Sequence, residues 1–141
     1  IKAFDDSDNL YGDTYRGMAL CTLGKSALAQ GDFAAARAAF KQAELHARGR
    51  NRARAVGHPF VHALCGLAET DNDPASFREA CDSYNDRANF NFAWFWNCSD
   101  DSTLLALARG AAAIGETDLA RKLLADAVNC GSTEAKDVRI S

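Results

Sequence analysis

The sequence predicts an all-α protein made of antiparallel helical hairpins that stack on one another. Three observations support this fold class. The first is composition: alanine is abundant and proline occurs only at Pro59 and Pro74, which favours helix because Ala is the best helix former and Pro the worst. The second is that apolar and small residues recur at the helical period. The third is that one pattern, a helix, a short break and a second helix, occurs three times in the 141 residues.

We expect the chain to form one domain, because 141 residues is a usual size for a single domain. Residues 1–13 carry four aspartates and little apolar periodicity, so we interpret them as an N-terminal segment that leads into the fold. Residues 14–141 form the predicted helical repeat domain. Its repeats cover about residues 14–47, 56–88 and 100–130.

The first repeat shows the pattern most clearly. Its first helix starts at Thr14 and ends where Gly31 and Asp32 break the apolar periodicity. Asp32 is placed to cap the second helix, which is expected over residues 33–47. The break is so short that the two helices must lie antiparallel against each other.

The second repeat has the same order of elements. Pro59 falls in the first turn of its first helix, where the missing N–H has no cost. Residues 70–74 form the break, and residues 75–89 form the partner helix.

The third repeat is expected to place its helices over residues 102–115 and 119–131. Gly131 is expected to supply a left-handed C-terminal cap. We expect the tail, residues 132–141, to start one further helix.

Equivalent residues of the three repeats can be aligned. The second helices carry an alanine in register, at spacings of 44 and 40 residues: Ala36, Ala80 and Ala120. The first helices carry leucine pairs at equivalent positions: Leu20 and Leu23, Leu64 and Leu67, Leu104 and Leu107. Each pair is followed by a small residue that lets two helices approach closely: Gly24, Ala68 and Ala108. A unit that leaves one apolar face for the next copy is typical of helical repeats.

With this register, the sequence resembles a tetratricopeptide repeat. The segment LCTLGKSALAQGDFAAARAAFKQA, residues 20–43, follows that pattern closely, and residues 105–127 are a second match. The middle repeat departs from it, with Asp71 where a large apolar residue is usual and Arg87 where alanine is usual. The resemblance covers about residues 14–130. The wording ALAQGDFAAARAAF and the long period are similar to the repeat and sensor regions of large LuxR-type ATP-dependent bacterial transcription regulators.

This resemblance implies a right-handed TPR-like superhelix of about three repeats. Its concave groove would bind a protein or a peptide, and no catalysis is implied. The expected function is therefore that of a non-enzymatic scaffold, a regulatory module of a larger bacterial signalling or transcription regulator.

The resemblance also implies which residues line the groove. The first repeat contributes Met18, Cys21, Lys25 and Leu28. The second contributes His62, Cys65, Glu69 and Asn72, and the third contributes Ser102, Leu105, Arg109 and Ala112. Among these, Lys25, Glu69 and Arg109 form a strip of mixed charge that suits a peptide or a small amphiphile better than a polyanion. The alternative is an ordinary solvated face that binds nothing.

An aromatic stretch lies between the second and third repeats: Phe90, Phe92, Trp94, Phe95 and Trp96. Core packing between hairpins is one interpretation. The other is contact with a ligand or partner through Trp94 and Trp96, because tryptophan is prominent at binding hot spots. On that second interpretation the protein is a domain that senses a small molecule or peptide in a pocket walled by residues 90–96.

We expect no metal, no cofactor and no catalytic residue. His58, His62 and Cys65 have the spacing to share a helix face, but no carboxylate with matching spacing completes a metal site. A Cys–His nucleophile is a second chemical interpretation of these residues, and the alternative to both is that His62 is a partly buried residue of the groove. Common phosphate-loop and hydrolase motifs are absent from the sequence.

Charge and cysteine content limit the expected partners. A formal net charge of −3 gives no reason to expect nucleic acid, and the basic run at residues 46–55 reads as a solvated loop. No apolar run is long enough for a membrane span, so we expect no membrane partner. Five scattered cysteines fit reduced, buried thiols in the cytoplasm. Terminal apolar faces of such an array favour self-association.

Overall fold

The all-α prediction is confirmed by the computed structural model, which describes residues 10–49, 58–89 and 101–139. Within those ranges the chain forms seven helices and no strand. The helices are α2 (Leu10–Ala29), α3 (Phe33–Gly49), α5 (His58–Asp71), α6 (Pro74–Asn89), α8 (Asp101–Ala113), α9 (Thr117–Asn129) and α10 (Thr133–Lys136).

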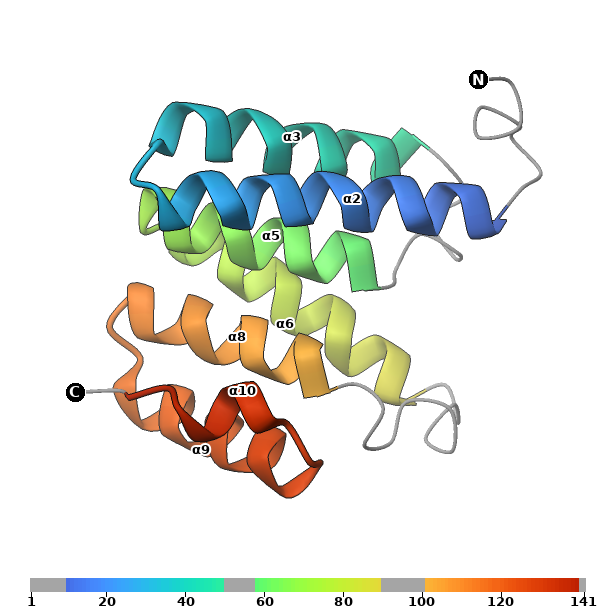
Figure 1. Ribbon diagram of the computed structural model, residues 1–141. Helices are drawn as coiled ribbons and strands as arrows, with labels where there is room; N and C mark the ends of the chain where they lie inside the picture. The colour runs from blue at the N-terminus through green and yellow to red at the C-terminus, as the bar shows by residue number, and fades with distance from the viewer. Residues whose placement is uncertain (1–9, 50–57, 90–100, 140–141) are drawn as a thin grey trace.

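The helices pair as three antiparallel hairpins: α2 with α3, α5 with α6, and α8 with α9 (Figure 1). Helices α2, α5 and α8 follow one another through the molecule, and α10 lies beside α9 at the end of the stack (Figure 1). The further helix expected in the tail is therefore present. Helix α2 begins at Leu10, earlier than Thr14, where the apolar periodicity starts.

The turn that ends the first helix of each hairpin has the same local chemistry. Its key residue has a positive φ, as Gly31 (78°), Asn72 (53°) and Gly115 (89°) show. The following N–H donates back to a carbonyl five residues earlier, for example from Asp32 to Ala27 at 2.9 Å. This is the Schellman arrangement, which favours Gly and tolerates Asn.

Two predicted helix caps are confirmed. The Asp32 carboxylate accepts a hydrogen bond from the Ala35 N–H at 3.1 Å and so caps α3. Gly131 has a φ of 93° after α9, the left-handed conformation expected of it. The chain then enters α10, where the Ser132 hydroxyl accepts from the Ala135 N–H at 3.0 Å.

The first two hairpins meet at what we call the first junction. The ring of Phe40 on α3 is fully buried between Gly24 of α2 and Gly66 of α5. A Cβ on Gly24 would come within 2.7 Å of this ring, and one on Gly66 would come closer still. Only glycine therefore allows α2 and α5 to approach the aromatic ring from both sides.

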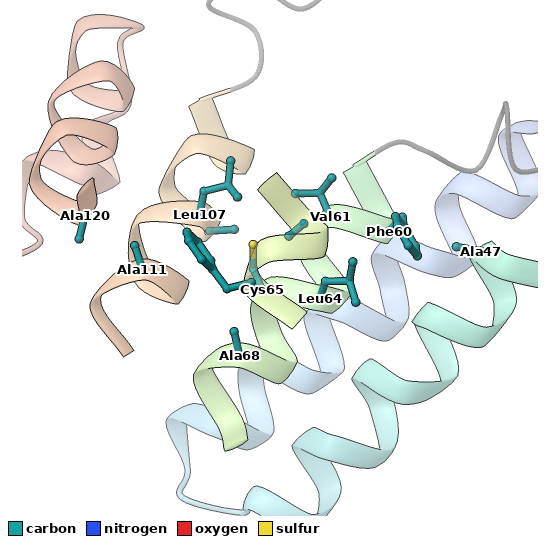
Figure 2. Packing of buried hydrophobic residues seen from close by; sticks show 12 residues of the cluster. Ala47, Phe60, Val61, Leu64, Cys65, Ala68, Leu107, Ala111 and Ala120 are labelled. Atoms are coloured by element: carbon teal, nitrogen blue, oxygen red, sulfur yellow. The ribbon is translucent and has the colours of Figure 1, made fainter. Parts of the chain in front are cut away.

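The last two hairpins meet at the second junction. Here α8 packs mainly against α5 and only lightly against α6. The buried Phe77 ring of α6 lies against Gly110, where an added Cβ would be 3.0 Å from the ring. Figure 2 shows Leu107 and Ala111 of α8 on one side of Cys65, within the cluster that includes these residues.

Helix α5 is the centre of the fold, because every residue from Phe60 to Ala68 is buried. Asp71 at its end occupies the position where the repeat pattern would have a large apolar residue. It accepts two hydrogen bonds from the guanidinium of Arg37 on α3, at 2.8 and 2.6 Å. This ion pair joins the first two hairpins.

Candidate functional site

The groove positions named from the sequence divide into a covered part and an open part. Cys21, His62, Cys65 and Leu105 are buried. Nearer the hairpin turns, Lys25, Asn72 and Ala112 are exposed, and Glu69 and Arg109 are half-buried. The face formed by α2, α5 and α8 therefore presents charged and polar groups mainly at its turn end.

A chain of polar contacts crosses these three helices. The Lys25 ammonium donates to Nδ1 of His62 at 3.0 Å, and Nε2 of His62 lies 3.2 Å from the Thr103 hydroxyl. An ammonium has no acceptor, so Nδ1 must carry the lone pair and the neutral ring must carry its proton on Nε2. Nε2–H then donates to Thr103. His62 therefore holds α2, α5 and α8 together inside the protein.

Glu69 lies on α5 between two cations of its neighbouring helices. Burial raises the pKa of the Glu69 carboxyl, while the charges of Arg109 and Lys25 act in the lowering direction. Because the net shift is upward, the cost of removing this carboxylate from water exceeds its attraction to the two cations.

Arg109 extends the polar contacts toward the end of the molecule. Its guanidinium donates to the Glu134 carboxylate of α10 at 3.2 Å, and both side chains are substantially exposed. The strip of mixed charge expected at Lys25, Glu69 and Arg109 thus continues with an acidic residue on α10.

Three thiols lie in environments that favour the protonated form. Burial raises the pKa of Cys21 and of Cys81 to about 11. Burial also raises the pKa of Cys65 well above its usual range. The thiolate is the reactive form of cysteine, so these three positions are poor places for a nucleophile, although Cys65 lies one helical turn from His62.

A metal site at His58, His62 and Cys65 has no support in the described parts of the chain, where no group of three or more His, Cys, Asp or Glu side chains is placed to hold an ion. His58 is the first residue of α5. Both nitrogens of His62 are already engaged in the contacts to Lys25 and Thr103.

Trp94, Trp96 and the rest of the aromatic stretch lie outside the described residues, as do residues 50–55 of the basic run. Arg48, at the start of that run, is described. Its guanidinium pairs with Glu44 at 2.9 Å and with Glu79 at 2.7 Å, and it lies 4.9 Å from the centre of the Phe60 ring. Arg48 therefore helps to hold the first two hairpins together at the first junction.

A hollow of about 530 Å³, which was not among the sites expected from the sequence, lies between α9 and the segment formed by α10 and the residues that follow it. Its lining combines apolar and basic side chains. The apolar lining includes Leu124, Val128 and Val138, and the cations are Arg121, Lys136 and Arg139.

Comparison with protein-family models, with curated proteins and with solved structures found no match for this chain. Among the helices that the structure describes, none combines the length and apolar character needed to cross a membrane.

Proposed function

We propose that the chain is a non-catalytic binding scaffold that takes a peptide across α2, α5 and α8. The observation that supports this proposal is the succession of Lys25, Glu69 and Arg109 at equivalent positions of the three first helices, at the end of the face that solvent reaches. On the TPR-like interpretation, this face is the concave groove, and the scaffold would be a module of a larger regulatory protein.

The charge order determines the class of peptide. A segment with an acidic, a basic and a second acidic residue would pair with Lys25, Glu69 and Arg109 in turn. Binding a basic side chain beside Glu69 would also offset the burial that raises the pKa of this carboxyl. The thiol environments described above support binding rather than nucleophilic chemistry.

A random peptide library displayed on phage tests the proposal. Selection against the native protein is expected to enrich peptides with alternating acidic and basic residues. Lys25→Met and Arg109→Met should each weaken the selected peptides by about two- to fivefold, because an exposed ion pair contributes roughly 0.2–1 kcal/mol. Binding should also weaken as ionic strength rises.

Lys122→Met is the matched control. Lys122 is exposed on α9, outside the face of the first helices, and its loss changes the net charge equally. Peptides that bind all three variants alike, or a library that yields no charged consensus, would contradict the proposed site.

A further inference from the structure

Helix α10 is held in place by buried groups rather than by its charges. It packs mainly against α9 (Figure 1). Ala135 and, just beyond the helix, Val138 belong to the apolar cluster that contains Leu105 of α8, a residue that the repeat resemblance assigns to the groove. The Ser132 hydroxyl caps the helix by accepting from the Ala135 N–H at 3.0 Å. The backbone of α10 is therefore fixed beside the α8 end of the proposed groove.

Glu134, in the first turn of α10, reaches a charged residue of that groove. The Arg109 guanidinium donates to the Glu134 carboxylate at 3.2 Å. On the proposed function, an acidic side chain of a peptide would pair with the same guanidinium. Glu134 therefore occupies, in the protein without a peptide, the position that this acidic side chain would take.

A second carboxylate is close enough to interact with Arg109. Burial raises the pKa of the Glu69 carboxyl, and the positive charge of Arg109 opposes that rise. One cation thus interacts with a carboxylate of α5 and with another of α10. An incoming acidic side chain would be repelled by both carboxylates, so it would gain little from Arg109 while Glu134 remains paired.

The Arg109–Glu134 pair can open without any unfolding of α10. The two side chains are 39% and 67% exposed, so water can replace the lost contact. Exposed ion pairs are weak, and exposed side chains change rotamer rapidly. Because Ala135 and Ser132 hold the helix, only the Glu134 side chain has to move.

We propose that the Arg109–Glu134 pair is an autoinhibitory contact, in which Glu134 blocks the acidic-residue position of the groove until a peptide displaces it. The inference rests on the proposed peptide binding and specifies how that binding is regulated. The contact selects among peptides, because only a carboxylate can compete with Glu134 for Arg109. A peptide without an acidic residue at this position leaves the pair intact and binds only beside Lys25 and Glu69.

Fluorescence anisotropy tests the contact, with the tightest peptide from the phage selection, labelled with fluorescein, as the probe. Glu134→Gln keeps the shape of the side chain and removes its charge, so the affinity should rise by about two- to fivefold. Asp126→Asn is the control, because Asp126 is exposed on α9, outside the face of the first helices. It changes the net charge equally and should leave the affinity unchanged.

Combining Glu134→Gln with Arg109→Met tests whether Glu134 acts through Arg109. The gain in affinity should disappear in the Arg109→Met background, because no guanidinium remains to be released. A gain that persists there would show general repulsion of the peptide and would overturn the autoinhibitory contact. Weaker binding by Glu134→Gln would show that Glu134 contacts the peptide directly, which would also overturn it.

Further outcomes separate this inference from the proposed function. If Arg109→Met weakens binding and Glu134→Gln leaves the affinity unchanged, the peptide site stands and the autoinhibitory contact is refuted. If selection against the native protein and against Glu134→Gln yields no charged consensus, both are refuted. A charged consensus that appears only with Glu134→Gln would support both. Circular dichroism of each variant checks that changes in affinity do not come from unfolding.

Discussion

The two junctions between hairpins are built differently, although the order of elements on both sides is the same. At the first junction, α3 packs along α5, and Phe40 fills the space between two glycines. Arg37–Asp71 and Arg48–Glu79 add ion pairs from α3 to the second hairpin. At the second junction, α8 depends mainly on α5, with Phe77 against Gly110 and the contact of His62 with Thr103.

This difference shows that the position of one aromatic ring determines how two hairpins meet. Phe40 lies in the middle of α3, and its equivalent in α6 is the half-buried Tyr84. Phe77 lies near the start of α6 and is 4% exposed, whereas its equivalent Phe33 is 53% exposed. The repeated pattern gives helices of similar length in each hairpin. The position of the large aromatic side chain then determines which helices of the next hairpin are contacted.

The largest expected effect comes from emptying the first junction. Phe40→Ala should lower the free energy of unfolding by about 3–5 kcal/mol, because the surrounding helices cannot fully fill the cavity. Phe33→Ala removes the same ring from an exposed site on the same helix and should change it by less than about 0.5 kcal/mol. Urea denaturation of both variants measures this, and equal losses would refute the role assigned to Phe40.

Adding one methyl group at each junction sharpens the comparison. Gly66→Ala forces the Phe40 ring to move and should destabilise the protein by about 1–3 kcal/mol, partly offset by the better helix propensity of alanine. Gly110→Ala needs a shift of only a few tenths of an ångström at Phe77, so the same gain of about 1 kcal/mol in propensity should roughly cancel it. Thermal denaturation of the two variants compares the junctions. A larger loss of stability for Gly110→Ala than for Gly66→Ala would show that the second junction is the more tightly packed.

Removing a charge from the first junction should have a smaller effect. Arg48→Met loses the pairs with Glu44 and Glu79 and the contact with the Phe60 ring, and should destabilise the protein by about 0.5–1 kcal/mol. Arg121→Met loses only a more exposed pair with Asp118 within α9 and should have almost no effect. The difference between the variants should shrink at high salt, as measured by urea denaturation; a salt-independent difference would assign the effect to packing.

The smallest expected effect concerns Glu69, whose carboxylate interacts with the charges of Lys25 on α2 and Arg109 on α8. Its pKa is raised in the folded protein, so the protonated form is relatively favoured there. The burial cost is present above the raised pKa and is relieved as the pH falls through it. The free energy of unfolding of Glu69→Gln, relative to that of the native protein, should therefore be highest at neutral pH. This difference in stability should become smaller as the pH is lowered.

Carbon-detected NMR titration of the Glu69 carboxyl separates the contributions of the two junctions. Arg109→Met should raise the Glu69 pKa more than Lys25→Met, because the Arg109 charge acts on it more strongly. A larger rise in the Glu69 pKa with Lys25→Met would show that the charge at the first junction acts more strongly on this carboxyl.

The sequence determined the features that depend on neighbouring residues. Gly31, Asp32 and Gly131 specify turns and caps through their own conformational preferences, and the apolar period specifies which segments are helical. The resemblance to a tetratricopeptide repeat also assigned Lys25, Glu69 and Arg109 to equivalent positions of the three first helices. These inferences need no knowledge of what lies across the next interface.

Only the tertiary structure decided which equivalent residues are buried. Leu23 and Leu67 are indistinguishable in the repeat pattern, yet one faces solvent because no described hairpin lies against it. His62 was expected to be a partly buried residue of the groove, and it links three helices from a fully buried position. Whether a residue is buried depends on which other elements pack against its segment. The type and spacing of a residue show that it can be buried, and the neighbouring hairpin determines whether it is.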